Sequence, residues 1–197
     1  MYGDYMRVFD FDNTIYDGES MVDFFHFIVD KKEELSKYKP IVNFALKLYE
    51  HNMLPMDFVK RQISKRSKEL NFKTDNLDKY IDEFWKTHRS KIMKKMLDKV
   101  KKDDVIITAC LDVLLKPVMK DLKAKTILCS EVDIKEKKVN FICYKENKVV
   151  KYREVFGDTP IDELYTDNFA DRPLMNIAKK VYYVDKKTKE IRVIKGE

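Results

Sequence analysis

MRVFDFDNT, residues 6–14, is a short apolar run that ends in two acidic residues and a turn-forming asparagine. The run predicts a buried strand over residues 6–11 that passes into a loop. In an extended segment Asp10 and Asp12 point to one face, so their carboxylates should converge. Carboxylates held that close either repel, which raises one pKa, or share a cation. The alternative is a plain turn after a strand, which Asp and Asn commonly form.

Beyond this stretch, strand-like and helix-like patterns alternate. Strands are predicted in DDVIITAC (103–110), KTILCS (125–130), VDIKEKKVNFICY (132–144, two strands around a charged turn), IDELYT (161–166) and KKVYYVDKKTKEIRVI (179–194, a strand and its hairpin partner). Helices are predicted over about Leu111–Leu122 and in KVVKYREVF (148–156). Short strands that alternate with helices indicate an α/β fold with a largely parallel sheet.

A long segment between the first and second strands, from about Glu19 to Lys102, contains only helix-like patterns. Its apolar residues at helical spacing are Met21, Phe24, Phe25, Ile28, Val42, Leu46, Tyr49, Phe58, Ile63, Leu70, Ile92, Met96 and Val100. Because this block interrupts an α/β pattern, it is interpreted as an insertion. We expect a core domain formed by residues 1–18 and 103–197, and a helical domain formed by residues 19–102.

The composition is that of a globular protein. The 197 residues are 44% hydrophobic and 38% charged, and the 40 basic and 34 acidic residues, with a net charge of +6, form no long block of one sign. Cys110, Cys129 and Cys143 are odd in number and widely spaced, which favours neither disulfides nor a zinc site and fits a reducing cytoplasm. The N-terminus lacks the pattern of a signal peptide, and FFHFIV (24–29) is too short for a membrane span.

Two further polar residues stand near the ends of predicted elements. Thr108 closes the apolar run VIIT before a predicted helix, and a hydroxyl with free backbone amides at a helix N-terminus can bind an anion. Lys148 starts a predicted helix, where its ammonium group could neutralise phosphate oxygens and a carboxylate nucleophile. Taken singly, such a threonine is more often a cap or packing residue, and a lysine in so basic a chain is usually solvated.

A second acidic pair follows the predicted strand IDELYT, in TDNFAD (166–171). Asp167 ends the strand, and Asp171 shortly precedes Pro173, which opens a helix. Mg²⁺ prefers oxygen ligands and usually takes one or two carboxylates, so Asp167 could hold the ion opposite Asp10. The alternative for Asp171 is a helix N-cap.

The order of these residues along the chain indicates an enzyme. An acidic pair, a hydroxyl, a lysine and a second acidic pair each lie near the end of a strand or the start of a helix, and ligands of α/β proteins bind outside the carboxyl ends of the strands. The set suits phosphoryl transfer. Asp10 would attack phosphorus to form an aspartyl phosphate, while Asp12 would protonate the leaving oxygen and later activate water.

These four segments resemble the motifs of the haloacid dehalogenase superfamily. The matching stretches are FDFDNT (9–14), the Thr of VIITAC (105–110), the Lys of ENKVVKYREVF (146–156) and TDNFAD (166–171). The helical insertion, together with CYKENKV (143–149) and YTDNFADRPL (165–174), is similar to the branch that contains phosphoserine phosphatases and bacterial phosphatidylglycerophosphatase-like hydrolases. The resemblance implies a Rossmann-like core with an all-helical cap.

The resemblance also implies a role for each acidic residue. Asp10 would be the nucleophile, and Asp12 the acid and base. Mg²⁺ would be held by Asp10, the backbone carbonyl of Asp12 and Asp167, with Asp171 supporting the surroundings of the metal. The paired Asp10 and Asp12 favour phosphate chemistry over dehalogenation.

Two residues depart from the family pattern. Lys145 and Asn13 both stand where many members have glycine. The substitution at Lys145 leaves the conformation of the loop before Lys148 less defined.

The helical cap should choose the substrate. Glu19 stands where phosphoserine phosphatases carry a glutamate that meets the substrate amine, Arg61 lies near the place of their carboxylate-binding arginine, and Asn13 and Thr14 are further candidates for substrate contacts. Alternatively, Arg61 lies on a solvated helix face. The basic run KIMKKMLDKVKK (91–102) and the aromatic residues would instead suit a lipid phosphate at a membrane surface, although helical spacing alone explains the aromatics as core.

The sequence therefore predicts a cytoplasmic, magnesium-dependent phosphomonoester hydrolase for a small phosphorylated metabolite, either phosphoserine-like or a lipid head-group phosphate. Two other functions stay open: a phosphotransferase of the same superfamily, and a non-catalytic protein that binds a phosphate ligand. No nucleic-acid partner is expected, since no known nucleic-acid-binding module occurs. Peripheral membrane contact stays open, as does the choice between a monomer and a homodimer.

Overall fold

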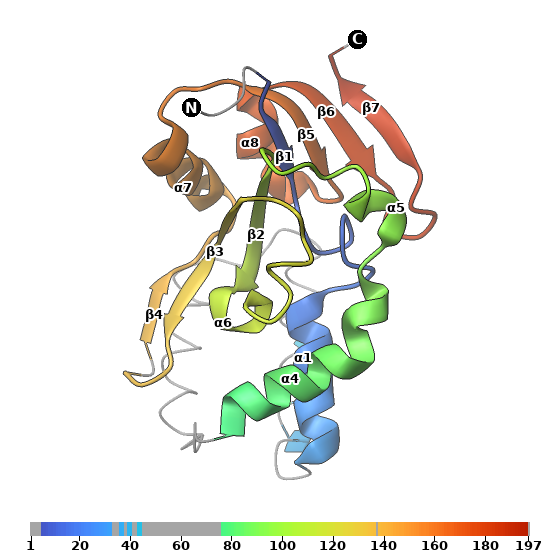
Figure 1. Ribbon diagram of the computed structural model, residues 1–197, viewed down its shortest axis with the longest axis vertical. Coiled ribbons are helices and arrows are strands. Elements are labelled where there is room, and N and C mark those ends of the chain that lie inside the picture. The colour runs from blue at the N-terminus through green and yellow to red at the C-terminus, as the bar shows by residue number, and fades with distance from the viewer. Residues whose placement is uncertain are drawn as a thin grey trace.

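The computed structural model describes residues 5–32, 36–37, 39–40, 43–44, 76–136 and 138–196. Within these ranges seven strands form one sheet in the order β4-β3-β2-β1-β5-β6-β7 (Figure 1). The strands are β1 (Arg7–Phe9), β2 (Val105–Leu111), β3 (Thr126–Asp133), β4 (Lys138–Phe141), β5 (Ile161–Thr166), β6 (Ala178–Val184) and β7 (Ile191–Lys195). The helices are α1 (Ser20–Lys31), α4 (Leu77–His88), α5 (Lys94–Leu97), α6 (Asp112–Leu115), α7 (Glu146–Phe156) and α8 (Arg172–Ile177), with the 3-10 helices η3 (Arg89–Lys91) and η4 (Phe169–Asp171).

Strand β1 lies at the centre of the sheet. It pairs in parallel with β2 and β5, so that Val8 lies opposite both Val105 and Leu164. Strands β3 and β6 continue the parallel sheet, and β4 and β7 close its edges as antiparallel partners. The predicted α/β fold with a largely parallel sheet is confirmed. Because the parallel strands share one direction, the segments that follow β1, β2 and β5 meet at one edge of the sheet.

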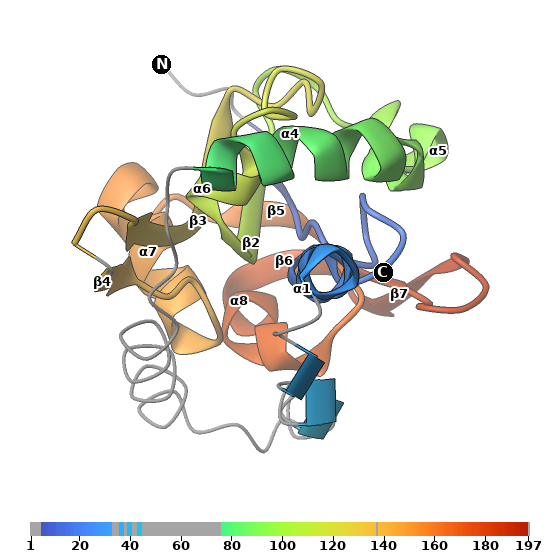
Figure 2. The same ribbon diagram turned by 90° about the horizontal axis from the view of Figure 1, so that it is seen from below.

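Successive side chains along each strand point to opposite faces of the sheet, so the hydrophobic core forms two layers, one on each face. Val8 and Ile107 belong to a hydrophobic cluster with α7 and α8. Phe9 and Ile106 belong to a second cluster with α4, α5 and α6. Figure 2 shows α4 and α8 on opposite sides of the sheet. The helices therefore cover both faces, as an α/β sheet of this kind requires.

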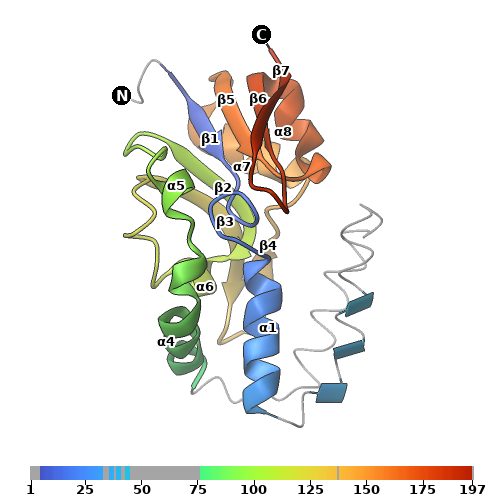
Figure 3. The same cartoon turned by 90° about the vertical axis from the view of Figure 1, so that its right-hand side faces the viewer.

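The helices α1 and α4 extend beyond the edge at which β1 ends (Figure 3). They contact each other through Phe24 and Phe84, whose ring centroids lie 5.3 Å apart. The helix expected from the apolar spacing of residues 21–28 is confirmed as α1. The expected positions Val42, Leu46, Tyr49, Phe58, Ile63 and Leu70 lie outside the described residues. Among the described helices, none has the length and apolar character of a membrane span.

Two predicted helices are much shorter in the structure. The helix expected over Leu111–Leu122 is reduced to α6, because β2 continues to Leu111 and Pro117 has no backbone N–H for a longer helix. The basic run 91–102 forms only the single turn α5, yet its Met96 is buried. Apolar spacing thus identified buried residues correctly but overestimated the length of the helices that carry them.

Helix α4 is joined directly to the core. Trp85 is buried, and its Nε1 donates to the backbone oxygen of Leu114 in α6 at 2.6 Å. The Trp85 ring also meets Tyr16 edge-on, with centroids 5.8 Å apart. Trp85 and Phe84 belong to the same hydrophobic cluster as Phe9 of β1. The interpretation of the aromatics of residues 19–102 as core is confirmed for Trp85, and any displacement of α4 has to open this cluster.

Candidate active site

Asp10 begins the loop after β1, at the edge where the parallel strands end. Its backbone N–H continues the pairing with β5 by donating to the carbonyl of Tyr165 at 2.8 Å. The residue is 6% exposed, and its Oδ1 accepts a hydrogen bond from Lys148 Nζ at 2.9 Å. Strand β1 and helix α7 thereby bring two of the predicted catalytic groups into direct contact.

Lys148 bridges the two acidic segments. It is 3% exposed, and its Nζ lies 2.9 Å from Asp10 Oδ1 and 2.8 Å from Asp171 Oδ1. The alternative of a solvated lysine is therefore wrong. Asp171 also accepts a hydrogen bond from the Thr166 hydroxyl at 2.8 Å and makes no side-chain capping bond to α8. The Asp171 carboxylate thus pairs with Lys148 and does not cap α8.

Burial and neighbouring charges shift the pKa values of this cluster. Burial raises the pKa of Asp10 to about 6, Lys148 opposes the rise and the charge of Asp167 adds to it. For Lys148, burial alone would lower the pKa, but Asp10 and Asp171 outweigh burial and raise it. Lys148 is therefore a permanent cation, whereas Asp10 in this arrangement loses its proton less readily than an ordinary aspartate.

Asp12 and Asp10 accept hydrogen bonds from different donors. Its Oδ1 accepts the backbone N–H of Ser20, the first residue of α1, at 2.8 Å. Burial, followed by the charge of Glu19, raises the pKa of Asp12 well above its usual range, and the charge of Asp10 adds to that rise. The acidic pair therefore interacts electrostatically, as its spacing predicts. A carboxyl group that keeps its proton in this way is suited to act as a general acid.

Glu19 joins the acidic cluster from the start of α1. Its Oε1 accepts a hydrogen bond from Asn13 Nδ2 at 2.8 Å and lies 3.6 Å from Lys186 Nζ. Asn13 has a φ of 55°, which glycine adopts freely and asparagine tolerates better than most residues. This conformation explains why asparagine can stand where many members of the superfamily have glycine.

Lys186 is a site residue that sequence reasoning missed. It lies in the turn between β6 and β7, and its Nζ is 3.2 Å from Oδ2 of the buried Asp167. Burial raises the pKa of Asp167, and Lys186 opposes that rise. Nothing in DKKTKE (185–190) distinguishes Lys186 from its neighbours. The one signal is the parallel register, which sets Thr166 beside Tyr183 and so brings the end of β6 next to Asp167.

The two predicted threonines lie in different parts of the site. Thr108 lies inside β2, and its hydroxyl oxygen accepts the N–H of Cys110 at 3.0 Å. The helix expected to follow Cys110 begins at Asp112 as α6, so Thr108 lies three residues before the end of β2 and not at the helix N-terminus itself. Thr14 is fully buried, and its hydroxyl has no hydrogen-bond partner within the described residues. Arg61, the other candidate for substrate contact, lies outside the described residues.

Lys145 immediately precedes α7 in a strained backbone conformation. Its φ of 50° and ψ of −123° are values that glycine adopts freely but that cost a residue with a side chain about 1–3 kcal/mol. The helix that follows is anchored in the core through Tyr152 and Phe156. The packing of α7 therefore keeps Lys148 in place although Lys145 is unfavourable in this loop.

The donors around Asp10 fit a hard divalent cation. Asp10 and Asp167 present buried carboxylates after the neighbouring strands β1 and β5, and the charge of Asp167 raises the pKa of Asp10. No group of three or more His, Cys, Asp or Glu side chains is arranged as a metal cage in the ranges that the structure describes. Mg²⁺ does not require one, because it binds one or two carboxylates and completes its shell with other oxygens. A cation between the two carboxylates would relieve their repulsion.

Several solved structures share this fold. A protein of unknown function from Bordetella pertussis Tohama I is 14% identical, with a TM-score of 0.69 over 87% of this chain and 86% of that one. A phosphoserine phosphohydrolase-like protein from Francisella tularensis is 16% identical, with a TM-score of 0.60 over 90% and 85%. A substrate-bound phosphoserine phosphatase is 13% identical, with a TM-score of 0.59 over 90% and 84%. At these identities the likeness shows a common fold.

The sequence itself matches a family described as haloacid dehalogenase-like hydrolases over residues 8–176, a span that includes all four motif segments. No curated protein matches the chain. The resemblance found in the motifs is confirmed, and the chain belongs to the haloacid dehalogenase-like hydrolases.

Proposed function

We propose that the chain is a magnesium-dependent phosphatase that hydrolyses small phosphomonoesters through an aspartyl phosphate on Asp10. The observation that carries the proposal is the buried ammonium group of Lys148, which contacts Asp10 and Asp171 at once. Burying charges is costly, and strongly perturbed groups of this kind are typical of catalytic sites. A fixed cation beside the nucleophile also lies where the negative charge of a phosphoryl group has to be stabilised.

In the first half of the reaction, Asp10 attacks phosphorus. Lys148 bonds to Oδ1, which leaves Oδ2 as the oxygen for the attack. A bond forms between Oδ2 and phosphorus, the ester P–O bond breaks, and Asp12 gives its proton to the leaving oxygen. The raised pKa of Asp12 supports this role, since the acid must hold a proton when the substrate arrives.

In the second half, Asp12 is the base. It takes a proton from water while the water oxygen bonds to phosphorus, and the bond between phosphorus and Asp10 breaks. Inorganic phosphate leaves, and the Asp10 carboxylate is restored. Asp10, Asp167 and the backbone carbonyl of Asp12 are the groups that would hold Mg²⁺, which supplies charge neutralisation between the nucleophile and the phosphate when bound.

We further propose that residues 1–18 and 103–197 form the catalytic core and that residues 19–102 form a cap that selects the substrate. Glu19 lies at this boundary and faces the site through Asn13 and Lys186. A carboxylate there suits a substrate with a positively charged group, such as a phosphoserine-like metabolite, while a lipid head-group phosphate is the second candidate. Cys110, Cys129 and Cys143 are free and buried, which supports a reducing cytoplasm.

The test is hydrolysis of p-nitrophenyl phosphate, followed by a panel of phosphorylated metabolites and lipid phosphates. We expect turnover with Mg²⁺, none after EDTA, and recovery when Mg²⁺ is restored. Asp10→Asn should abolish turnover because the amide cannot attack phosphorus. Asp103→Asn removes an exposed acid outside the site and serves as the control. Full activity of Asp10→Asn, or of the chelated enzyme, would overturn the proposed mechanism.

A further inference from the structure

The turn between β6 and β7 is built to present Lys186 at one place. Asp185 Oδ1 accepts the backbone N–H groups of Lys187 at 2.9 Å and Thr188 at 2.8 Å, which fixes the turn. Lys189 Nζ lies 2.8 Å from Asp17 Oδ1, so the turn is tied to the loop that follows β1. These contacts hold Lys186 beside the acidic cluster.

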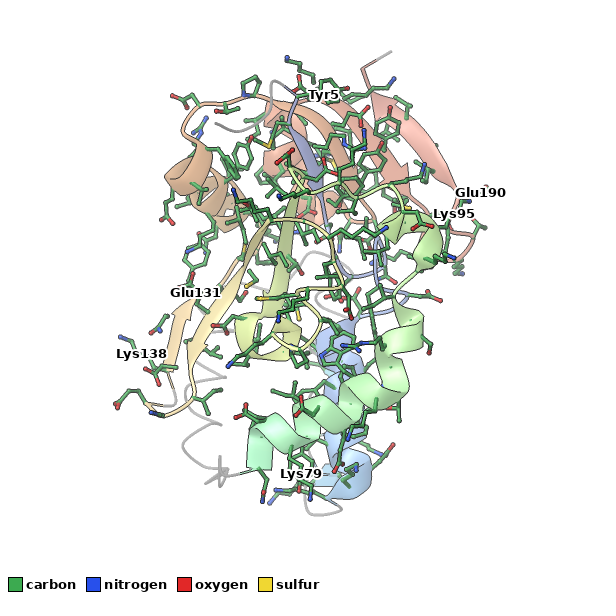
Figure 4. The ribbon with its side chains drawn as sticks, in the orientation of Figure 1. Tyr5, Lys79, Lys95, Glu131, Lys138 and Glu190 are labelled. Carbon is green, nitrogen blue, oxygen red and sulfur yellow. The ribbon has the colours of Figure 1, made fainter. Side chains whose placement is uncertain are left out.

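A cavity separates the hairpin from α5. Lys95, Lys99, Glu190 and Arg192 line a cavity between α5 and the hairpin. Figure 4 shows Lys95 and Glu190 beside each other at this border. The hairpin therefore faces α5 across this cavity, while the Lys189–Asp17 ion pair ties it to the loop after β1 and keeps Lys186 beside the site.

The two lysines of the site pair with four of its acids, two each. Lys148 is committed to Asp10 and Asp171 and is almost fully buried. Asp167 and Glu19 have Lys186 as their cation, with Nζ to oxygen distances of 3.2 and 3.6 Å. Asp167, the proposed metal ligand that follows β5, is thus neutralised by Lys186, which lies outside the four motif segments.

Lys186 also differs from Lys148 in its freedom to move. Its side chain is 35% exposed, against 3% for Lys148. A lysine on a flexible stem at such a site can give up one partner without becoming a buried, unpaired charge. Glu19 lies on its other side and remains as a partner if Asp167 is taken by a metal.

We propose that Lys186 is the resident counter-ion of the metal site: it neutralises Asp167 when no metal is bound and must leave Asp167 when Mg²⁺ binds. This inference rests on the proposed function, because it assumes that Asp167 is a metal ligand. Lys186 then sets the affinity for Mg²⁺ by competition, and in the metal-free site it keeps the buried Asp167 and the half-buried Glu19 from facing each other without a cation. Lys186 is a positioning residue in this role and takes no part in bond breaking.

The expected effect follows from charge. Removing a cation 3.2 Å from a metal ligand removes both a competitor and a repulsive charge. Even with strong solvent screening, the loss of such a charge should strengthen Mg²⁺ binding by about tenfold or more. The metal-free protein should lose thermal stability at the same time, because Asp167 and Glu19 would face each other without a cation.

The experiment is calorimetric titration of the full chain with MgCl₂, in parallel with thermal unfolding in EDTA and in saturating Mg²⁺. Lys186→Gln is compared with Lys187→Gln, which makes the same change in net charge at an exposed neighbour. We expect tighter Mg²⁺ binding only in Lys186→Gln, together with a lower Tm in EDTA and a larger rise in Tm on adding Mg²⁺.

The outcomes separate this inference from the proposed function. Equal Mg²⁺ affinity in the two variants would overturn the role of Lys186 and leave the proposed phosphatase standing. Weaker binding in Lys186→Gln would also overturn it, because Lys186 would then assist the metal rather than compete with it. If no form of the chain bound Mg²⁺, the metal site and the role of Lys186 would fail together.

Discussion

Buried carboxylates occupy both ends of the parallel sheet, but they are partnered in opposite ways. Where the strands begin, Asp104 is paired with Arg7, whose Nε donates to it at 2.9 Å. Asp162 at the same end accepts the backbone N–H of Met6 and the ammonium group of Lys179, each at 2.7 Å. Each of these acids has a cation of its own.

Where the strands end, the described residues place five acids and two lysines in one cluster. Asp10 and Asp171 contact Lys148, and Asp167 and Glu19 contact Lys186. Asp12 interacts with the charges of Glu19 and Asp10. The pKa values move accordingly. The pKa of Asp162 is lowered, because the hydrogen bonds from Lys179 and Met6 outweigh its burial, whereas burial raises that of Asp10. The same residue type therefore stabilises the fold at one end of the sheet, and at the other end it is kept reactive at a cost in stability.

Replacing an acid at the reactive end should have the largest effect, and on rate alone. Asp12→Asn removes the proton donor and base, so the rate on every phosphoester should fall about 10²–10⁴-fold. Stability in urea should not fall, because the charge of Glu19 opposes ionisation of Asp12 and the amide removes that repulsion. Initial rates across a substrate panel and urea unfolding of the metal-free protein measure the two quantities. A clear loss of stability without loss of rate would show that Asp12 stabilises the fold and is not a catalytic acid.

Replacing an acid at the opposite end should affect stability alone. Asp104→Ala leaves the guanidinium group of Arg7 without its carboxylate, and the side chains of the pair are only 5% and 14% exposed. Breaking a buried pair from one side costs about 3–5 kcal/mol. We expect that loss in urea unfolding, with an unchanged rate for each folded molecule. Asp103→Ala, an exposed neighbour, is the control, and equal losses in both variants would show that the pair contributes nothing.

The pH dependence of stability should have opposite signs at the two ends. Because the pKa of Asp10 is raised from 3.8 to about 6, its contribution is present below pH 4 and lost as pH rises through about 6. At 1.36 kcal/mol per pKa unit this amounts to about 3 kcal/mol at most. In EDTA, Asp10→Asn should flatten the decline between pH 4 and 6.

Asp162 provides the matched comparison for the pH experiment. Its lowered pKa stabilises the fold above the pKa of an unfolded aspartate, and that contribution is lost as pH falls through the folded pKa. Asp162→Asn should therefore flatten only the acid side of the curve, below about pH 4. Unfolding curves of both variants between pH 2.5 and 8, at intervals of roughly half a unit, test the pair together. If the two variants had the same pH dependence of stability, the acids at the two ends of the sheet would not differ in the way described.

Local sequence patterns were sufficient to predict the regular helices and strands and the residues whose type the proposed chemistry requires. The periodicities of KVVKYREVF and IDELYT predicted α7, which begins two residues earlier, and β5, and the chemistry of the site predicted that Lys148 would neutralise Asp10. The contact between Lys148 and Asp171 is an addition of the structure. Partners that depend on tertiary placement were beyond reach. Lys186 is one of 40 basic residues, and only the β5–β6 register gives it a role.

The same limit explains why the lengths of two helices were overestimated. The apolar residues after Thr108 and after Ile92 recur at helical spacing, but they are buried from short turns as effectively as from helices. Spacing records which side chains face the core and says little about the backbone between them. Pro117 is the one local sign that the segment after β2 could not continue as a helix.

The placement of Trp85 gives the molecule an optical reporter. The chain has a single tryptophan, and that residue lies between α4 and the core, with its indole N–H bonded to the Leu114 carbonyl and its ring against Tyr16. Intrinsic fluorescence therefore reads one contact of the protein rather than an average over many. Exposure of the indole to water would shift its emission to longer wavelength, so a titration with substrate or metal reveals directly whether α4 leaves the core while the rest of the chain stays folded.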